Sequence, residues 1–148
     1  MKKSVVILLA VVCLLSVLLI SFMGRVIKHN DETVYANSIK IHDYDSAYKE
    51  TIEGKETLCY YKNIYYDSHG YARYQIDCEV LPSNATNTNK RFKMAGNTEG
   101  VSVNEATGLV EITSLEKEDT TVVVYIYPED GTPLKYPVCM KIMACPAD

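Results

Sequence analysis

The sequence predicts an all-β sandwich preceded by one N-terminal transmembrane helix. The first observation is an uncharged apolar run over residues 4–24, between two lysines and a polar stretch. The second is a series of short segments after it, in which apolar and polar residues alternate or β-branched residues accumulate. The third is that Gly, Pro, Asn and Asp separate these segments, at spacings typical of two packed sheets rather than of an α/β fold.

The apolar run predicts a membrane anchor. It holds 21 residues without charge, and as a helix it would reach about 31 Å, close to the ~30 Å hydrocarbon core of a bilayer. A cleaved signal peptide is the alternative, with a cleavage motif at Val34, Tyr35 and Ala36, although the apolar core of such peptides normally spans about 7–15 residues. Lys2 and Lys3 favour a cytoplasmic amino terminus, so we expect the rest of the chain outside, or secreted after cleavage.

The chain divides into a transmembrane signal-anchor over residues 1–24, a polar linker over residues 25–36 and a β-sandwich domain over residues 37–148. The first strand of the domain is expected at residues 38–42, where Ile39 and Ile41 share one face. A tyrosine-rich segment follows over residues 55–74. It predicts an extended hairpin that turns at residues 67–70, where glycine accepts the positive φ that such a turn needs.

The clearest half-buried strand lies in residues 71–81. There Tyr74, Ile76, Cys78 and Val80 alternate with polar residues, which predicts that these four side chains face the core. A loop rich in Asn, Ser and Thr follows, and a charged loop is expected later in the domain. The further strands are expected at residues 90–94, 101–103, 109–112, 120–127 and 136–143, the two loops at residues 82–89 and 116–119.

Four cysteines of the predicted domain are candidates for disulfide bonds, whereas Cys13 belongs to the apolar run. They are Cys59, Cys78, Cys139 and Cys145. An even number in a small exported domain predicts one or two bridges, but all three connectivities stay open, and so do free thiols. The alternation directs Cys78 toward the core and Cys139 outward. No cysteine or histidine spacing indicates a zinc site.

The second half of the domain contains segments that resemble the bacterial Ig-like domain, group 2. The V-x-P-S-N-A-T-N element of that family corresponds to VLPSNATN at residues 80–87. The lysine-led strand at 90–94, the V-x-V at 101–103 and the Gly-Leu-Val at 108–110 follow in the order of the family. A β-branched run, an Asp-Gly turn and a final strand that begins with cysteine at 139–143 complete the match.

The resemblance extends over about residues 38–143 and implies an immunoglobulin-like β-sandwich outside the cytoplasm, in surface proteins and often in adhesins. It implies no catalytic residues. Two departures stand out. The family usually has a tryptophan where this chain has Met94, a flexible apolar residue that can fill the same gap. The segment at residues 55–74 is also longer than the corresponding strand of the family.

Composition and motifs argue against several function classes. The net charge is −4, and all 19 acidic residues follow the apolar run, which disfavours nucleic acid and anionic lipid as partners of the domain. The three histidines are scattered, and nothing indicates a nucleophilic triad or a cluster of oxygen ligands for calcium. We therefore predict that the protein is not an enzyme and uses no metal or cofactor.

Tyrosines gather in one part of the chain, since eight of the twelve lie between Tyr44 and Tyr74. Amphipathic rings beside planar hydrogen-bonding groups suit sugar or protein recognition, although tyrosine is also simply a good strand residue. The predicted binding residues are Tyr60, Tyr61, Asn63, Tyr65, Tyr66, His69, Tyr71 and Arg73.

We therefore expect a membrane-anchored extracytoplasmic module for binding or adhesion at the bacterial cell surface. Its partner would be a glycan, a cell-wall component or a protein, because each of these offers surfaces on which aromatic rings pack. The alternative is a passive structural spacer, or a subunit of an envelope complex with no ligand of its own.

Overall fold

The computed structural model describes residues 3, 5, 7, 11–18, 32–113 and 120–147. The chain forms two compact units, Met1–Glu32 and Thr33–Asp148. In the first, residues 11–18 are helical and their side chains are exposed. The predicted membrane helix at residues 4–24 and the charged loop at 116–119 lie partly or wholly outside the described residues. Among the residues that are described, no helix has the length and hydropathy needed to cross a membrane.

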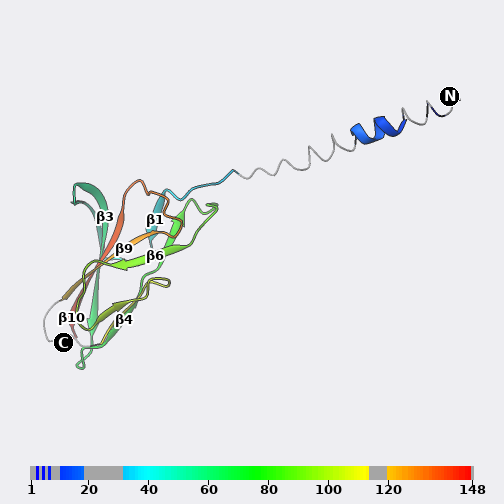
Figure 1. Ribbon diagram of the computed structural model, residues 1–148. Coiled ribbons are helices and arrows are strands. Elements are labelled where there is room, and N and C mark those ends of the chain that lie inside the picture. Colours follow the sequence, from blue (N-terminus) through cyan, green and yellow to red (C-terminus); the bar gives the residue numbers. More distant parts are fainter. Residues whose placement is uncertain are drawn as a thin grey trace. The chain divides into compact units, whose positions relative to one another are not determined.

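The second unit is all-β, and its described residues form ten strands in three sheets (Figure 1). The strands are β1 (Ser38–Ile41), β2 (Ser46–Ile52), β3 (Lys55–Tyr66), β4 (Ala72–Gln75), β5 (Cys78–Leu81), β6 (Lys90–Met94), β7 (Val101–Val103), β8 (Leu109–Ile112), β9 (Thr120–Pro128) and β10 (Val138–Pro146). The strands predicted at 90–94, 101–103 and 109–112 are confirmed with the same bounds. The strand predicted at 136–143 is present as β10, which begins two residues later and ends three residues later.

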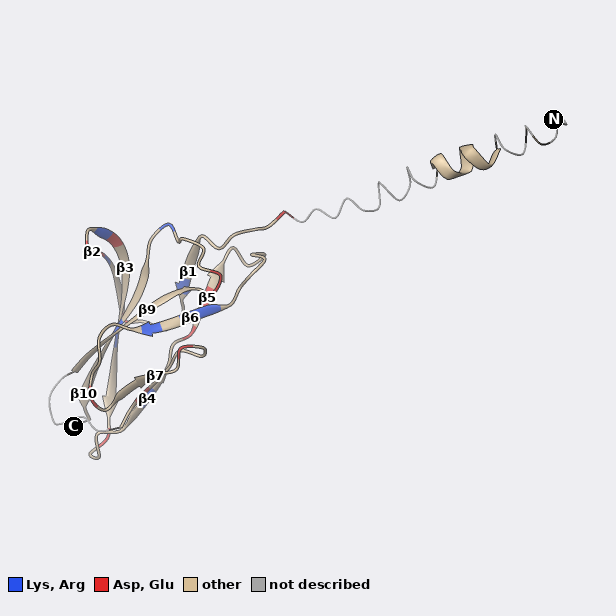
Figure 2. Cartoon of the chain, in the orientation of Figure 1, with Lys and Arg blue, Asp and Glu red and all other residues tan. Residues whose placement is uncertain are grey.

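The largest sheet has five strands in the order β2-β3-β10-β9-β6. β10 lies in its centre, parallel to β3 on one side and antiparallel to β9 on the other. β9 has no charged residue and is rich in β-branched and aromatic side chains, as a central strand should be. Figure 2 shows the contrast with β6 at the edge, where Lys and Arg predominate.

The two smaller sheets, β1-β5 and β4-β8-β7, are consecutive parts of one layer. Only Ile76 and Asp77 separate β4 from β5, and both backbones remain paired: the Ile76 N–H donates to the Gly108 carbonyl at 3.2 Å, and the Asp77 carbonyl accepts from His42 N–H at 3.0 Å. Tyr74, Ile76, Cys78 and Val80 are all buried, which confirms the predicted alternation across this break.

One hydrophobic core lies between the layers and draws on all three sheets, an arrangement consistent with a β-sandwich. Phe92 and Met140 from the five-stranded sheet and Val110 and Ile112 from the other layer are fully buried in it. Gly108 is required here for two reasons. Its φ is +74°, and a Cβ at this position would lie 2.6 Å from the Phe92 ring.

The predicted hairpin at residues 55–74 was wrong. The turn is present, because Gly70 N–H donates to the Asp67 carbonyl at 2.9 Å, but the chain crosses there from one layer to the other. β3 pairs with β2 and β10, and β4 pairs with β8. The hairpin that does form joins β2, a strand that was not predicted, to β3 through Glu53 and Gly54, which have φ of 51° and 78°. Two successive positive φ values match the twist of a tight hairpin.

Candidate binding face

The outward side of the five-stranded sheet carries aromatic and sulfur-containing side chains. Directly paired residues share a face, so the register places Tyr48, Cys59, Cys139 and Tyr125 in one row across β2, β3, β10 and β9. The outward residues of neighbouring rows belong to the same surface. We call this surface the tyrosine face and define it by Tyr48, Glu50, Cys59, Tyr61, Tyr65, Tyr125, Tyr127, Cys139, Lys141 and Met143.

The tyrosine face combines exposed rings with fully buried thiols. Tyr48 and Tyr65 are 61% and 69% exposed, whereas Cys59 and Cys139 are 0% exposed. These two cysteines lie outside the main core cluster, although the outward strand position would ordinarily expose them. Tyr48 and Tyr125 flank the cysteines within their row. The tyrosine face therefore has a small buried apolar centre at the two cysteines, and the rings of Tyr48 and Tyr65 beside it remain accessible to a partner.

A polar trio is part of this face and consists of Glu50, Tyr61 and Lys141. The Tyr61 hydroxyl donates to Glu50 Oε1, and the Lys141 ammonium donates to Glu50 Oε2 at 2.5 Å and to the Tyr61 hydroxyl at 3.1 Å. These bonds lower the pKa of Glu50, with the ammonium as the larger cause. They raise the pKa of Lys141, chiefly through Glu50.

Aromatic contacts hold the ring of Tyr61 as well. The rings of Tyr48 and Tyr61 meet edge to face with centroids 5.8 Å apart, and the Lys141 ammonium lies 5.2 Å from the Tyr61 centroid. The trio thus fixes a hydroxyl, a carboxylate and an ammonium beside aromatic surface. Such an arrangement provides both contact area and oriented hydrogen-bonding groups for a partner.

Three of the eight predicted binding residues lie on the outward side of β3. Tyr61 and Tyr65 belong to the tyrosine face, and Asn63 lies between them. The Asn63 N–H donates to Asp45 Oδ2 at 2.8 Å. Tyr60 and Tyr66 point the opposite way, into the core. The successive tyrosine pairs therefore separate as strand geometry demands, with one ring packed and the other displayed.

The other three predicted residues lie apart from this face. His69 and Tyr71 belong to the turn after β3, where Asp67 Oδ1 accepts both backbone N–H groups at 2.9 and 3.0 Å. These bonds lower the pKa of Asp67. Arg73 is on β4 in the other layer, where its Nε lies 2.8 Å from Glu111 Oε1. The eight residues do not form one site.

Several residues of the tyrosine face were not among the predicted binding residues. Tyr125 and Tyr127 had a usable signal, because they alternate with Val122, Val124 and Ile126, which are buried. Their outward direction follows from that alternation alone. Tyr48 and Glu50 had none, because their strand was not predicted.

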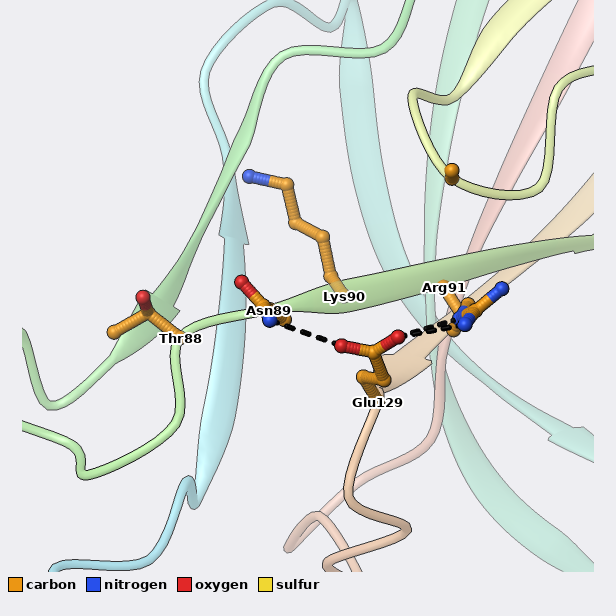
Figure 3. A pocket seen from close by; sticks show the side chains of 6 residues that line it. Thr88, Asn89, Lys90, Arg91 and Glu129 are labelled. Carbon is orange, nitrogen blue, oxygen red and sulfur yellow. Dashed lines mark hydrogen bonds and ion pairs between the residues drawn. The ribbon is translucent and has the colours of Figure 1, made fainter.

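A second candidate is a polar pocket of about 310 Å³ lined by Thr88, Asn89, Lys90, Arg91, Ala106 and Glu129 (Figure 3). Arg91 donates to Glu129 Oε1 from Nε at 3.0 Å and from Nη2 at 2.6 Å. Asn89 Nδ2 donates to the other oxygen at 2.9 Å. These bonds, the arginine first, lower the pKa of Glu129. Lys90 extends to the other side of the strand and donates to the Cys78 carbonyl.

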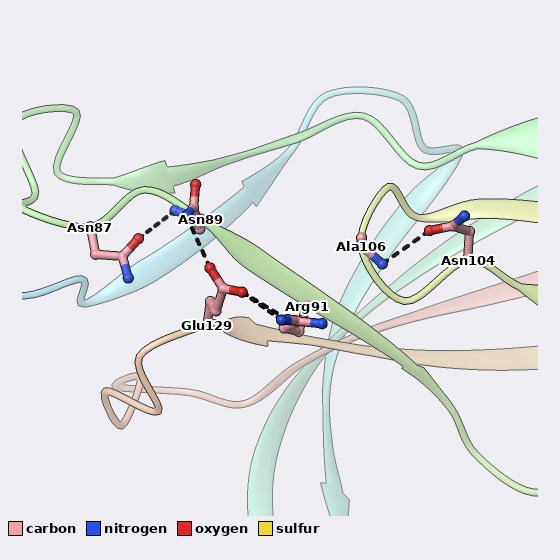
Figure 4. A network of polar contacts seen from close by, with 6 residues as sticks. All are labelled: Asn87, Asn89, Arg91, Asn104, Ala106 and Glu129. Atoms are coloured by element: carbon pink, nitrogen blue, oxygen red, sulfur yellow. Dashed lines mark hydrogen bonds and ion pairs between the residues drawn. The ribbon is translucent and has the colours of Figure 1, made fainter.

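Several polar groups around this pocket are hydrogen-bonded to one another. Figure 4 shows the chain of contacts, in which Asn87 Oδ1 accepts the N–H of Asn89 at 2.9 Å before Asn89 reaches Glu129. On the opposite wall Asn104 Oδ1 accepts the N–H of Ala106 at 3.0 Å. The bonds between Asn89 and Glu129 fasten the loop at residues 82–89 to the turn after β9, and the Asn104 bond closes the turn between β7 and β8. We assign them a structural role and take the tyrosine face as the candidate site.

No known family model matches this chain, and no curated protein matches it either. Within the described part of the chain, no group of three or more His, Cys, Asp or Glu residues is placed to hold a metal ion. The functional interpretation therefore depends on the geometry and chemistry of the residues themselves.

Proposed function

We propose that this protein is an extracytoplasmic immunoglobulin-like module of the bacterial cell surface, held at the membrane by its N-terminal apolar segment. It binds a glycan, cell-wall or protein partner through the tyrosine face. The observation that carries the proposal is the exposure of Tyr48 and Tyr65 on a sheet face that also holds the Glu50, Tyr61 and Lys141 trio. Exposed rings with oriented polar groups are typical of recognition surfaces.

The strand order supports the immunoglobulin-like assignment. With β4 and β5 counted as one interrupted strand, one layer has the order β1-β5/β4-β8-β7 and the other contains β6-β9-β10. These are the A-B-E-D and C-F-G orders of an immunoglobulin sandwich. The β2-β3 hairpin is the addition, and it enlarges the C-F-G layer by two strands. The added hairpin supplies Tyr48, Tyr61 and Tyr65 to the proposed binding surface.

Replacing Tyr48 and Tyr65 by serine together tests the proposal. Both rings are exposed and lie outside the core, so the double variant keeps the fold while losing ring contacts. Retention of the full chain on purified cell-wall material, or on partner protein from the same envelope, is expected to fall at least about tenfold, since a tenfold loss needs only about 1.4 kcal/mol.

The matched control replaces Lys40 and Arg73 by serine on the other layer. These residues are exposed too, and their loss is expected to leave retention unchanged. If the tyrosine variant is retained like the unsubstituted chain, the face is not a binding surface and the module is a passive spacer.

Cell fractionation tests the proposed location separately. A membrane-bound product of full length supports the anchor. A shorter secreted product beginning near residue 37 supports cleavage and moves the module to the medium or wall, and a product found only inside the cell contradicts the proposal.

A further inference from the structure

Cys59 and Cys139 lie directly opposite each other on the neighbouring parallel strands β3 and β10. The Cys139 thiol donates to Cys59 Sγ at 2.8 Å, and both residues are fully buried. We propose that these two thiols form a disulfide that covalently joins β3 to β10 beneath the tyrosine face. In the cell the bond needs an oxidising compartment, so its formation there rests on the proposed extracytoplasmic location.

Strand geometry permits this bond. Neighbouring strands lie about 4.8 Å apart, within the range of about 4.4–6.8 Å that disulfides span between Cα atoms. Directly paired residues also send their Cβ atoms to the same face. Both cysteines are outward residues of the five-stranded sheet, so each thiol points to the same side of the sheet as its partner.

The other pairings that the sequence leaves open are far less favourable. Cys145 is six residues beyond Cys139 on the same strand, which places it roughly 20 Å away along that strand. Cys78 belongs to the main core, on the opposite side of the sheet from the two facing thiols. Burial there raises the pKa of Cys78 to about 11 and leaves it an inert apolar residue. The structure therefore selects Cys59 with Cys139.

The reaction is an exchange with a disulfide-carrying oxidant, either a thiol oxidase of the envelope or a small-molecule disulfide. One cysteine thiolate attacks the oxidant disulfide, forms a mixed disulfide and releases one oxidant thiolate. The second cysteine thiolate attacks the mixed disulfide and releases the other. Cys59 and Cys139 together lose two protons and two electrons, and the oxidant gains them as two thiols.

Burial determines when this exchange takes place. Neither thiol is accessible in the folded domain, and burial also raises the pKa of Cys139, so little nucleophilic thiolate is present there. Oxidation therefore occurs while the sheet is still assembling. Once formed, the bond is shielded from reductants by the same burial. It links positions 80 residues apart, so it removes much conformational freedom from the unfolded chain.

The test is refolding of the full chain with oxidised glutathione, followed by alkylation and peptide mapping without reduction. We expect one linked peptide pair, containing Cys59 and Cys139, with Cys13, Cys78 and Cys145 alkylated. In the native state the bond should resist dilute reductant, whereas in denaturant it should be reduced rapidly. Complete alkylation of all five thiols of the full chain, or linkage of any other pair, would overturn the proposal.

Variants provide a second readout. Reductant applied during refolding should lower the thermal midpoint of the unsubstituted chain and of a Cys145→Ser variant by several degrees. A Cys59→Ala/Cys139→Ala variant should show no such shift, and if it fails to fold, the peptide map of the unsubstituted chain still decides. Correct linkage in a chain that cells retain in the cytoplasm would support the pairing and contradict the proposed function.

Discussion

The two outward faces of the β domain differ in the kind of side chain they present. On the smaller layer, directly paired residues form ion pairs at the surface, Lys40 with Glu79 at 3.4 Å and Arg73 with Glu111 at 2.8 Å. On the five-stranded sheet, the row of directly paired outward residues has Tyr48 and Tyr125 on either side of two buried thiols. An outward strand position therefore does not by itself expose a residue, because large neighbours in the same row can exclude water from a small one.

The difference has a thermodynamic meaning. The charged face consists of solvated pairs that each contribute little to stability. On the tyrosine face, the side chains around Cys59 and Cys139 exclude water from these two residues, so the centre of the face is packed like a small hydrophobic core. We therefore expect the domain to be sensitive to polar substitutions at the buried positions of the tyrosine face, Cys59 and Cys139. It should tolerate them at the exposed rings of that face and at the charged outward face of the smaller layer.

The largest effect is expected from a charge placed under the tyrosine face. Cys139→Lys buries an ammonium where the thiol is fully enclosed and adds bulk to a filled space. We expect it to lower the free energy of unfolding by about 3 kcal/mol or more. Ser102→Lys, at an exposed position of β7, should change it by no more than about 0.5 kcal/mol. Urea unfolding of both variants measures the contrast, and equal losses would refute it.

A smaller effect is expected within the polar trio. Tyr61→Phe removes the hydroxyl that links Glu50 and Lys141 but keeps the ring. It should cost about 1 kcal/mol of unfolding free energy in the same urea assay. Tyr65→Phe is the control, because its exposed ring makes the same substitution nearly neutral. Identical midpoints for the two variants would show that the trio contributes nothing to stability.

On the charged face, Arg73→Ala should cost only about 0.2–1 kcal/mol. Its ion pair with Glu111 is exposed, so added salt should screen most of the difference between variant and parent. Thermal midpoints measured at low and high ionic strength test this. A difference that persists undiminished at high salt would mean that Arg73 acts through packing.

The smallest effect is expected in the acid response. Lys141 and Tyr61 hold the pKa of Glu50 below its ordinary value of 4.5. A carboxyl with a lowered pKa stabilises the fold above that ordinary value and loses its contribution as the pH falls through the folded-state pKa. Glu50→Gln should therefore flatten the fall of the thermal midpoint on acidification, whereas Tyr65→Phe should keep the parent slope. Parallel curves for all three proteins would contradict the prediction.

Local patterns were sufficient for much of the fold. The alternation from Tyr74 to Val80 identified a core-facing strand, and the β-branched segment at 120–127 identified β9. In both segments, buried and exposed side chains alternate within a few residues, so a short stretch of sequence is enough to identify the strand. The prediction that Cys139 points away from the main core is also confirmed, although its complete burial was not expected.

The remaining features depend on contacts distant in sequence. The turn at Asp67 gave no sign that the chain crosses between layers there, because a turn has the same local chemistry in a hairpin and in a crossover. β2 has no buried residue and only a weak alternation, so the local pattern does not predict it. The tyrosine face and the Cys59–Cys139 juxtaposition both require the parallel register of β3 with β10, which no local pattern encodes.

The central position of β10 makes the order of synthesis matter. This strand is made after the nine others, yet it fills the space between β3 and β9. A nascent chain that has not reached residue 138 therefore presents two unpaired backbone edges instead of a continuous sheet, and such edges recruit strands from other molecules. A chain that ends before this strand should therefore be prone to aggregation, because incompletely folded chains with open strand edges associate with one another.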